Sequence, residues 1–243
     1  MSLTKLQQYW NEFGKSDPMW AVLMDPSKRG NRWDKQEFFH TGMSEIEALL
    51  NDLKALSPTL EMGNALDFGC GVGRLSQALA VRFKQVHGVD IAPSMITEAD
   101  KHNQFPRTCH YHLNDTDDLS AFPSNSFDLV YSCRVLQHIE PQYSINYIQE
   151  FCRILSPTGS LVFQIPDSPV LAIRLRLGLK SLIPTALLNL VGKKKGGPET
   201  LMHCVPRREI TQLIERNNLR IVEIKADNSA PGWSSFRYVV AKN

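Results

Sequence analysis

From residue 64 onward, short runs of apolar residues alternate with longer segments whose apolar residues recur at helical spacing. This alternation is typical of a parallel β-sheet that is covered by helices on both faces. The apolar runs predict strands near residues 64–69, 86–90, 108–113, 127–132 and 159–165. The periodic segments predict helices near residues 73–84, 93–102 and 141–155.

The C-terminal part of the chain follows a different pattern. A helix is predicted from Pro206 to Asn217, and two strands follow at 219–226 and 235–241. The link between these strands is too short for a crossover, so they are expected to pair antiparallel. The predicted fold class is therefore α/β, with a doubly wound, mostly parallel, seven-stranded sheet that ends in one antiparallel hairpin.

Two segments lie outside this pattern. Residues 1–60 combine a predicted helix near 43–56 with an aromatic-rich lead-in, and residues 167–204 interrupt the sheet. In open α/β sheets, ligands bind beyond the carboxyl ends of the strands, where extra segments form walls and lids. We therefore predict an N-terminal helical lid segment over 1–60 and a main domain over 61–243, with a lid insertion at about 167–204.

Part of the insertion has a composition that suggests two roles. Residues 170–195 are rich in leucine and arginine, and they predict short helices broken near Pro184. Such a segment either packs as a lid on its own domain or rests on a membrane surface and admits a lipid-like ligand.

A glycine-rich turn follows the first predicted strand. Asp67, Gly69, Gly71 and Gly73 form a D-x-G-x-G-x-G pattern, and Asp90 closes the next strand. The glycines allow the backbone to approach a ligand and to turn sharply into a helix. An acid about 20 residues after the first glycine suits a ribose diol, which it can hold with two hydrogen bonds. The turn and the acid together predict a nucleoside site.

The same turn argues against a dinucleotide. A G-x-G-x-x-G fingerprint would need glycine at Arg74 or at Ser76, so a nicotinamide oxidoreductase is disfavoured. Asp67 suits the ammonium group of an amino acid better than a pyrophosphate. At this point the chain resembles the class I S-adenosylmethionine-dependent methyltransferases, which share this Rossmann-like fold and whose D/E-x-G-x-G-x-G turn holds methionine.

The resemblance implies roles for the residues around the turn. The backbone at Gly69 and Gly71 would contact the methionine moiety, and Asp67 would orient the turn or the ammonium group through water. Arg74 would reach the methionine carboxylate, or else it is a solvated first-turn arginine. Cys70 ends a central strand and is expected near the cofactor.

It also implies how the nucleoside is held. Asp90 would bind the ribose hydroxyls, while Ile91 and Met95 would pack on the adenine or serve only as core residues. Asp115 would accept the adenine amino group and the backbone at Thr116 would serve a ring nitrogen, unless this acidic cluster only caps a turn.

The loop after the fourth strand would lie beside the transferred methyl group. It reads Ser132-Cys133-Arg134, which lacks the Asp/Asn-Pro-Pro-Tyr signature of enzymes that methylate nucleic-acid bases. It also lacks the aspartate that a magnesium-dependent catechol enzyme would need, so no metal is expected. Cys133 is expected near the cofactor, and His138 is the candidate general base, or else a histidine that binds loop backbone.

The implied reaction moves a methyl group from S-adenosylmethionine to an oxygen or nitrogen of a small-molecule acceptor and leaves S-adenosylhomocysteine. One alternative is a membrane-proximal enzyme for a quinone or other lipid-like acceptor. Another is a non-catalytic S-adenosylmethionine-binding protein. The sequence leaves the acceptor and the oligomeric state open.

The composition of the chain indicates which partners, which cysteine chemistry and which cellular location are expected. The chain has 243 residues, 42% of them hydrophobic, and a net charge of +2, so a nucleic-acid partner is not expected. Five cysteines without a C-x-x-C pair argue against disulfides and zinc, and they favour a reducing cytoplasmic location. No signal peptide or bilayer-spanning run is visible. His110 and His112 share a strand face, but a third metal ligand is not evident.

Overall fold

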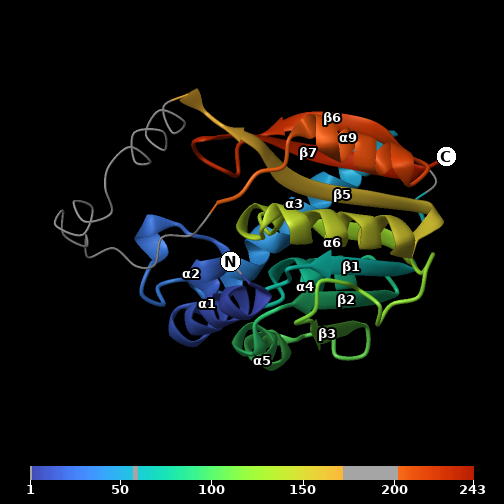
Figure 1. Ribbon diagram of the computed structural model, residues 1–243. Helices are drawn as coiled ribbons and strands as arrows, with labels where there is room; N and C mark the ends of the chain where they lie inside the picture. Colours follow the sequence, from blue (N-terminus) through green and yellow to red (C-terminus); the bar gives the residue numbers. More distant parts are fainter. Residues whose placement is uncertain (1, 57–59, 172–201) are drawn as a thin grey trace.

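A seven-stranded sheet of order β3-β2-β1-β4-β5-β7-β6 lies at the centre of the computed structural model, which describes residues 2–56, 60–171 and 202–243 (Figure 1). The strands are β1 (Asn64–Phe68), β2 (Gln85–Asp90), β3 (Cys109–Leu113), β4 (Phe127–Ser132), β5 (Leu155–Pro169), β6 (Leu219–Asp227) and β7 (Trp233–Lys242). The strands from β1 to β5 pair parallel, and β7 pairs antiparallel with both β5 and β6. The predicted fold class is confirmed.

Two strands are longer than the sequence predicted. β5 continues to Pro169 and β7 begins at Trp233, because these two strands keep pairing beyond the apolar core. Ser160 pairs with Ala241 near one end of this ladder, and Pro169 pairs with Trp233 at the other. The apolar pattern alone predicted only the part of each strand that is buried on both faces.

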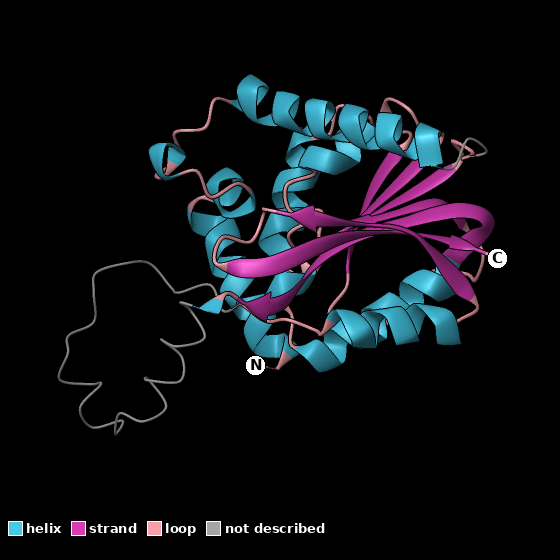
Figure 2. Cartoon of the chain, turned by 90° about the horizontal axis from the view of Figure 1, so that it is seen from above, coloured by secondary structure: helices cyan, strands magenta, loops and turns pink. Residues whose placement is uncertain are grey.

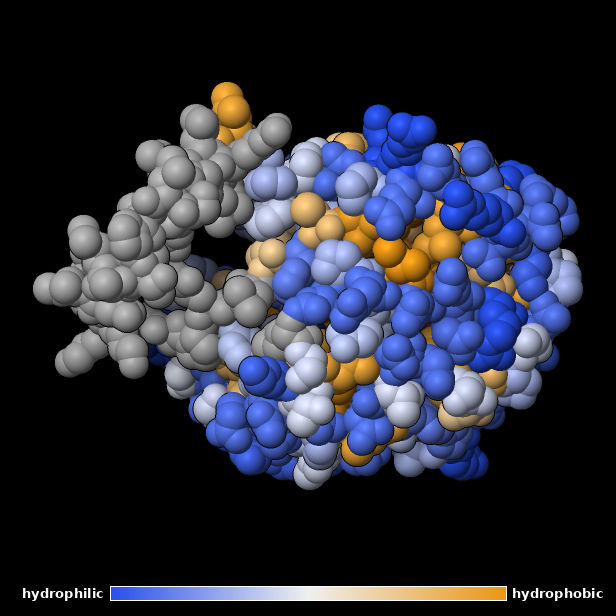
Figure 3. Space-filling model, viewed as in Figure 1, coloured by the Kyte–Doolittle hydropathy of each residue, from blue (hydrophilic) through white to orange (hydrophobic). Residues whose placement is uncertain are grey.

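Helices cover both faces of the sheet, as the view from above shows (Figure 2). Those that follow the strands are α4 (Arg74–Ala80), α5 (Pro93–His102), α6 (Pro141–Ile154) and α9 (Arg207–Arg216). Phe151 of α6 and Ile214 of α9 are buried in one core cluster, and Leu79 of α4 is buried in another. The outer surface over α6 and α9 is largely hydrophilic, with hydrophobic side chains visible between these helices (Figure 3).

The N-terminal segment is more helical than the sequence indicated. It forms α1 (Leu3–Ser16), α2 (Pro18–Val22), the 3-10 turn η1 (Pro26–Lys28) and α3 (Lys35–Leu56). The prediction of a helix near 43–56 found only the end of α3. The helix begins eight residues earlier because the Asp34 carboxylate accepts the Glu37 backbone N–H at 2.9 Å and so caps its first turn.

Close contacts fix this segment on the sheet domain. A Cβ atom on Gly42 of α3 would lie 2.3 Å from the backbone oxygen of Arg74, so only glycine lets α3 approach α4 this closely. On α1, Asn11 accepts hydrogen bonds from the Ser94 backbone and hydroxyl at 3.0 and 2.8 Å. The N-terminal helices are thereby fixed beside the ends of β1 and β2.

Within the three described ranges, no helix is both long and apolar enough to cross a membrane. Most of the predicted insertion at 167–204, including the helices expected in 170–195, lies outside the described residues.

Candidate active site

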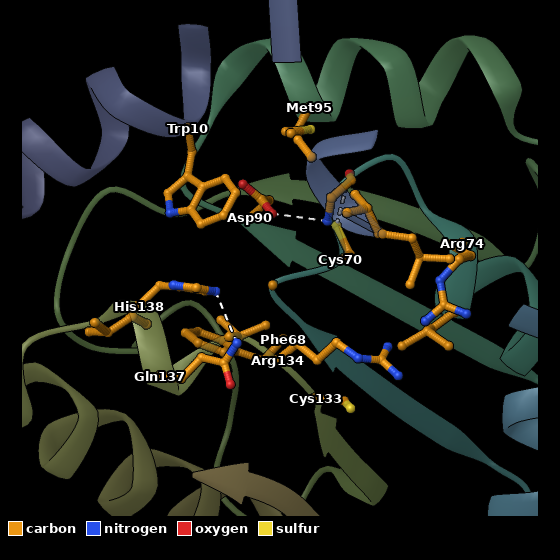
Figure 4. A pocket seen from close by; sticks show the side chains of 18 of the residues that line it. Trp10, Phe68, Cys70, Arg74, Asp90, Met95, Cys133, Arg134, Gln137 and His138 are labelled. Atoms are coloured by element: carbon orange, nitrogen blue, oxygen red, sulfur yellow. Dashed lines mark hydrogen bonds between the residues drawn. The ribbon is translucent and has the colours of Figure 1, made fainter. Parts of the chain in front are cut away.

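A cavity of about 660 Å³ lies at the carboxyl ends of the central strands, within the size range of small-ligand pockets (Figure 4). Phe68 at the end of β1, Asp90 at the end of β2 and Cys133 after β4 line one side of it. Trp10 from α1 and Trp33 from the segment before α3 line it from the N-terminal part of the chain. The cavity therefore combines the predicted nucleoside turn with an aromatic wall.

The glycine turn forms because three of its residues adopt left-handed backbone angles. The φ angle is +77° at Gly69 and +53° at Gly71. A Cβ atom at Gly69 would lie 2.2 Å from Val135, and one at Gly71 would lie 2.6 Å from Val22 of α2. Both glycines line the cavity. The absence of a Cβ atom at these glycines permits the left-handed turn and the close approach of Val135 and Val22. It also allows a ligand to approach the backbone.

Asp90 lies on the cavity wall and is fixed by backbone groups. Its Oδ2 accepts the Gly71 N–H at 2.9 Å, and its Oδ1 accepts the Ala92 N–H at 2.8 Å. Burial raises the pKa of this carboxyl, and the backbone hydrogen bonds oppose the rise. A carboxylate offers about four acceptor positions, so Asp90 can also accept hydrogen bonds from the hydroxyl groups of a ligand.

Asp67 lies behind the cavity and does not line it. The residue is 1% exposed, and its Oδ2 accepts the Ser76 hydroxyl at 2.6 Å. This bond ties the end of β1 to α4, which agrees with a role in orienting the turn. Burial raises the pKa of Asp67 to about 6, and the Ser76 hydrogen bond acts in the opposite direction.

Asp67→Asn should change how stability depends on pH. The folded-state pKa of about 6 exceeds the ordinary value of 3.8, so the protonated carboxyl favours folding at low pH, and this contribution is lost as pH rises to about 6. Between about pH 3 and pH 7, the free energy of unfolding of the variant should therefore gain about 3 kcal/mol relative to the wild type. Urea unfolding at several pH values across this range measures the difference in free energy of unfolding between the variant and the wild type. Exposed Asp100→Asn serves as the control. A difference that is constant with pH contradicts the assignment.

Arg74 is neither solvated nor directed only at the cavity. It is 2% exposed, and its guanidinium binds Glu45 Oε2 at 2.7 Å and the Thr41 hydroxyl at 3.3 Å. The alternative of a solvated first-turn arginine is wrong, because α3 covers the start of α4. Arg74 still lines the cavity, and its Nε has no hydrogen-bond partner among the described residues.

Arg134 shares the same carboxylate. Its Nη1 lies 3.3 Å from Glu45 Oε2, and the Tyr131 hydroxyl donates to Glu45 Oε1 at 3.1 Å. Burial would raise the pKa of Glu45, but Arg74 and Arg134 together hold it below its ordinary value. Figure 4 shows both arginines at one end of the cavity, away from Trp10 and His138. Two guanidinium groups with one carboxylate leave this end positively charged, which suits an anionic group such as a carboxylate.

Cys70 and Cys133 both line the cavity, and their place near the cofactor stays a prediction. Cys70 is 4% exposed, and burial raises the pKa of its thiol well above the ordinary range. Cys133 is more accessible, although burial raises its pKa to about 12. Both thiols are therefore protonated at neutral pH and react slowly with alkylating reagents.

Cofactor should protect Cys133 from alkylation. We expect saturating S-adenosylhomocysteine to slow the labelling of Cys133 by iodoacetamide at least several-fold, because the ligand covers the cavity wall. Cys204 has similar partial exposure but does not line the cavity, so it serves as an internal control. Peptide mapping by mass spectrometry measures both rates, and equal Cys133 rates with and without ligand would refute this placement.

The structure separates the predicted adenine residues into two groups. Ile91 and Met95 line the cavity. Asp115 and Thr116 are exposed and do not line it, whereas Asn114, one residue earlier, does. The Asn114 side chain is held by hydrogen bonds to backbone oxygens of this loop. Adenine recognition by Asp115 and Thr116 stays a prediction, and Asn114 is a cavity residue that the sequence interpretation missed.

The predicted base lies at the opposite end of the cavity from the arginines. His138 ends the 3-10 turn η2 (Leu136–His138), and its ring meets the edge of Trp10 with centroids 5.2 Å apart. Its Nε2 lies 3.1 Å from the Gln137 side-chain nitrogen. Trp10, Arg134 and Gln137 are further cavity residues to which the sequence analysis gave no role.

Three other histidines, His87, His110 and His112, form a cluster on the sheet. His112 Nε2 lies 2.9 Å from Nδ1 of His87 on the neighbouring strand, and His110 Nε2 lies 3.1 Å from Gln85 Oε1. No group of three or more metal-ligating side chains arranged to hold an ion occurs in the described part of the chain.

Comparison with known proteins shows what this domain is similar to. Residues 66–163 match a family model described as a methyltransferase domain. A ubiquinone biosynthesis O-methyltransferase of Xanthomonas campestris pv. campestris (strain B100) is 30% identical over 132 residues, which cover 54% of each chain. This chain thus spans about half the length of such curated relatives. A protein of the same name from Coxiella burnetii (strain Dugway 5J108-111) is 26% identical over 237 residues, covering 95% of this chain and 84% of that one.

Solved structures agree in fold. Magnesium protoporphyrin IX methyltransferase from Synechocystis PCC 6803, with bound S-adenosylhomocysteine, superposes with a TM-score of 0.69 at 18% identity and covers 99% of both chains. An S-adenosylmethionine-dependent methyltransferase from Clostridium acetobutylicum has a TM-score of 0.61 at 15% identity, covering 96% of this chain and 99% of that one. Together, the comparisons show that residues 66–163 are similar to a methyltransferase domain and that this chain shares the fold of solved S-adenosylmethionine-dependent methyltransferases.

Proposed function

We propose that this protein transfers the methyl group of S-adenosylmethionine to an oxygen or nitrogen atom of a small-molecule acceptor and releases S-adenosylhomocysteine. The observation that carries this proposal is the composition of the cavity. Its sheet side carries the glycine turn and Asp90, and its N-terminal side carries Trp10, Trp33 and other apolar groups. One cavity thus offers a nucleoside site and an apolar surface for a second molecule.

The residues present fit the cofactor. Gly69 and Gly71 carry no side chains of their own on the turn, Asp90 lies on the cavity wall where its carboxylate can accept from ribose hydroxyls, and the arginine end suits the methionine carboxylate. When bound, S-adenosylmethionine supplies a methyl group that is already activated on its sulfonium. The task of the chain is therefore to orient an acceptor in line with that methyl group and to exclude water.

Residues 1–60 form the lid in this proposal. Trp10, Leu23, Met24 and Trp33 from this segment line the cavity, and Val22 packs directly over Gly71. This largely apolar and aromatic wall favours an acceptor with a flat apolar body. The names of the Xanthomonas and Coxiella relatives support oxygen as the receiving atom, and they keep a quinone-like acceptor as the second candidate.

A labelling experiment tests the proposal. The protein is incubated with a metabolite extract of its source cells and S-adenosylmethionine that carries a deuterated methyl group, and the aqueous and organic phases are analysed by mass spectrometry. We expect a labelled product that is absent with Asp90→Ala. Label in the organic phase identifies the lipid-like acceptor. Cofactor binding without any labelled product in either phase would contradict the transferase proposal and favour a binding protein.

A further inference from the structure

A chain of buried amides lies behind His138. Gln164 of β5 is 1% exposed, Gln137 of η2 is 5% exposed, and Ser235 of β7 is 3% exposed. The Gln164 side-chain nitrogen lies 2.6 Å from the Ser235 hydroxyl and 3.2 Å from Gln137 Oε1. The Gln137 side-chain nitrogen lies 3.1 Å from His138 Nε2, and Figure 4 shows this last contact as a dashed line.

A backbone N–H group fixes the orientation of the first side-chain amide in this hydrogen-bonded row. The Arg134 N–H lies against Gln164 Oε1, with 3.0 Å between nitrogen and oxygen. A backbone N–H can only donate, so the Gln164 atom that faces it must be the carbonyl oxygen. The Gln164 NH₂ group must then face Gln137 and Ser235, where it donates to both. The orientation of the first amide is thus set by an unambiguous donor.

The orientation of the Gln137 amide in turn determines which nitrogen of the His138 ring carries a proton. Because Gln137 Oε1 accepts from Gln164, the Gln137 NH₂ group is the one that faces His138, and it donates to Nε2. An imidazole nitrogen that accepts a hydrogen bond carries no proton, and a protonated imidazolium has no acceptor nitrogen. The ring in this arrangement is therefore neutral, with its single proton on Nδ1.

We propose that Gln164 and Gln137 are positioning residues that hold His138 as the neutral Nδ1–H tautomer on the cavity wall. A protonated Nε2 would place two donors 3.1 Å apart. Turning the Gln137 amide would relieve this clash, but it would set its NH₂ group against that of Gln164. Leaving a buried polar group unsatisfied is energetically costly, so the hydrogen-bonded amides resist both changes.

This arrangement changes the role expected of His138. Neither ring nitrogen offers a free lone pair while the chain of amides is intact, so His138 does not take a proton from the acceptor. On the proposed transferase function, the acceptor class that fits is one whose receiving atom can attack at neutral pH without first losing a proton to a base, such as a carboxylate or an unprotonated amine. The tautomer itself rests only on the contacts given above.

Nitrogen NMR of the histidine rings tests the tautomer without any acceptor or turnover, so its failure is separate from failure of the proposed function. Two-bond proton–nitrogen spectra of ¹⁵N-labelled protein at pH 7 distinguish protonated from unprotonated ring nitrogens. His138→Gln assigns the signals by their loss, and exposed His40 serves as internal reference. We expect His138 to show a protonated Nδ1 and an unprotonated Nε2. An Nε2–H tautomer or a charged ring in the wild type would overturn the proposal.

Two variants test the positioning role. In Gln137→Glu, a carboxylate accepts from the ring, so the proton should appear on Nε2. Gln164→Leu does not touch His138, but it frees the Gln137 amide to turn, so both tautomers should appear. Each variant is first compared with the wild type by circular dichroism. If Gln137→Glu does not fold, Gln164→Leu decides the question. An unchanged single Nδ1–H tautomer in a folded variant would contradict the positioning role.

Discussion

Replacing Glu45 with alanine should lower the free energy of unfolding by about 3–5 kcal/mol, because it leaves a buried charge without a partner. Arg74 is 2% exposed, and its 2.7 Å contact with Glu45 is the ion pair that compensates its charge. The substitution also removes the carboxylate that Arg134 and the Tyr131 hydroxyl contact. Three groups on the sheet domain would lose their partner on α3.

Urea unfolding measures the effect, with Glu47→Ala as the matched control. Glu47 lies two residues further along α3 on its exposed side, so its loss should change stability by no more than about 0.5 kcal/mol. The pKa of Glu45 is lowered in the folded state, so its contribution is present above the ordinary carboxyl pKa and is lost as pH falls through the folded-state value. If Glu45→Ala lowers the free energy of unfolding at pH 7 no more than Glu47→Ala does, Glu45 does not compensate the buried charge of Arg74.

Asp90→Ala should weaken binding of S-adenosylhomocysteine by about 1.5–3 kcal/mol, or roughly 10- to 150-fold, as expected for hydrogen bonds to a charged group. The variant loses the acceptors for ribose hydroxyls, and it also frees the Gly71 and Ala92 N–H groups that now hold the turn. Asp90→Asn keeps one acceptor oxygen and should lose less affinity.

Calorimetric titration gives the affinities, and unfolding curves separate a local loss from global destabilisation. Asp100→Ala is the control, since Asp100 is exposed on the adjacent α5 and does not line the cavity. An affinity for Asp90→Ala equal to that of the wild type would refute the assignment of Asp90 to the ribose.

The sheet and the glycine turn could be predicted because both depend on local sequence. Apolar runs of strand length and glycines at fixed spacing require particular backbone conformations wherever they occur. The prediction failed where the environment of a side chain depends on a residue far away in the sequence. Arg74 was read as a solvated or ligand-binding side chain because its partner, Glu45, lies 29 positions earlier on another helix. No local pattern indicates that pairing.

Site residues from other elements were missed for the same reason. Trp10 was noted only as part of an aromatic lead-in, and its place on the cavity depends on how α1 docks against α5 through Asn11 and Ser94. Gln164 looks like an ordinary polar residue in a strand. The role proposed for Gln164 depends on its hydrogen bonds to Gln137 and to the Arg134 backbone, which form only in the folded sheet.

Calorimetric titration of the purified protein with S-adenosylmethionine, S-adenosylhomocysteine and NAD tests the central claim most directly. The cavity combines the glycine turn, Asp90 and a positively charged end that suits a carboxylate. We therefore predict micromolar binding of both sulfur nucleosides, weakened in Asp90→Ala, and no binding of NAD. Binding of NAD without S-adenosylhomocysteine, or no nucleoside binding at all, would contradict the account.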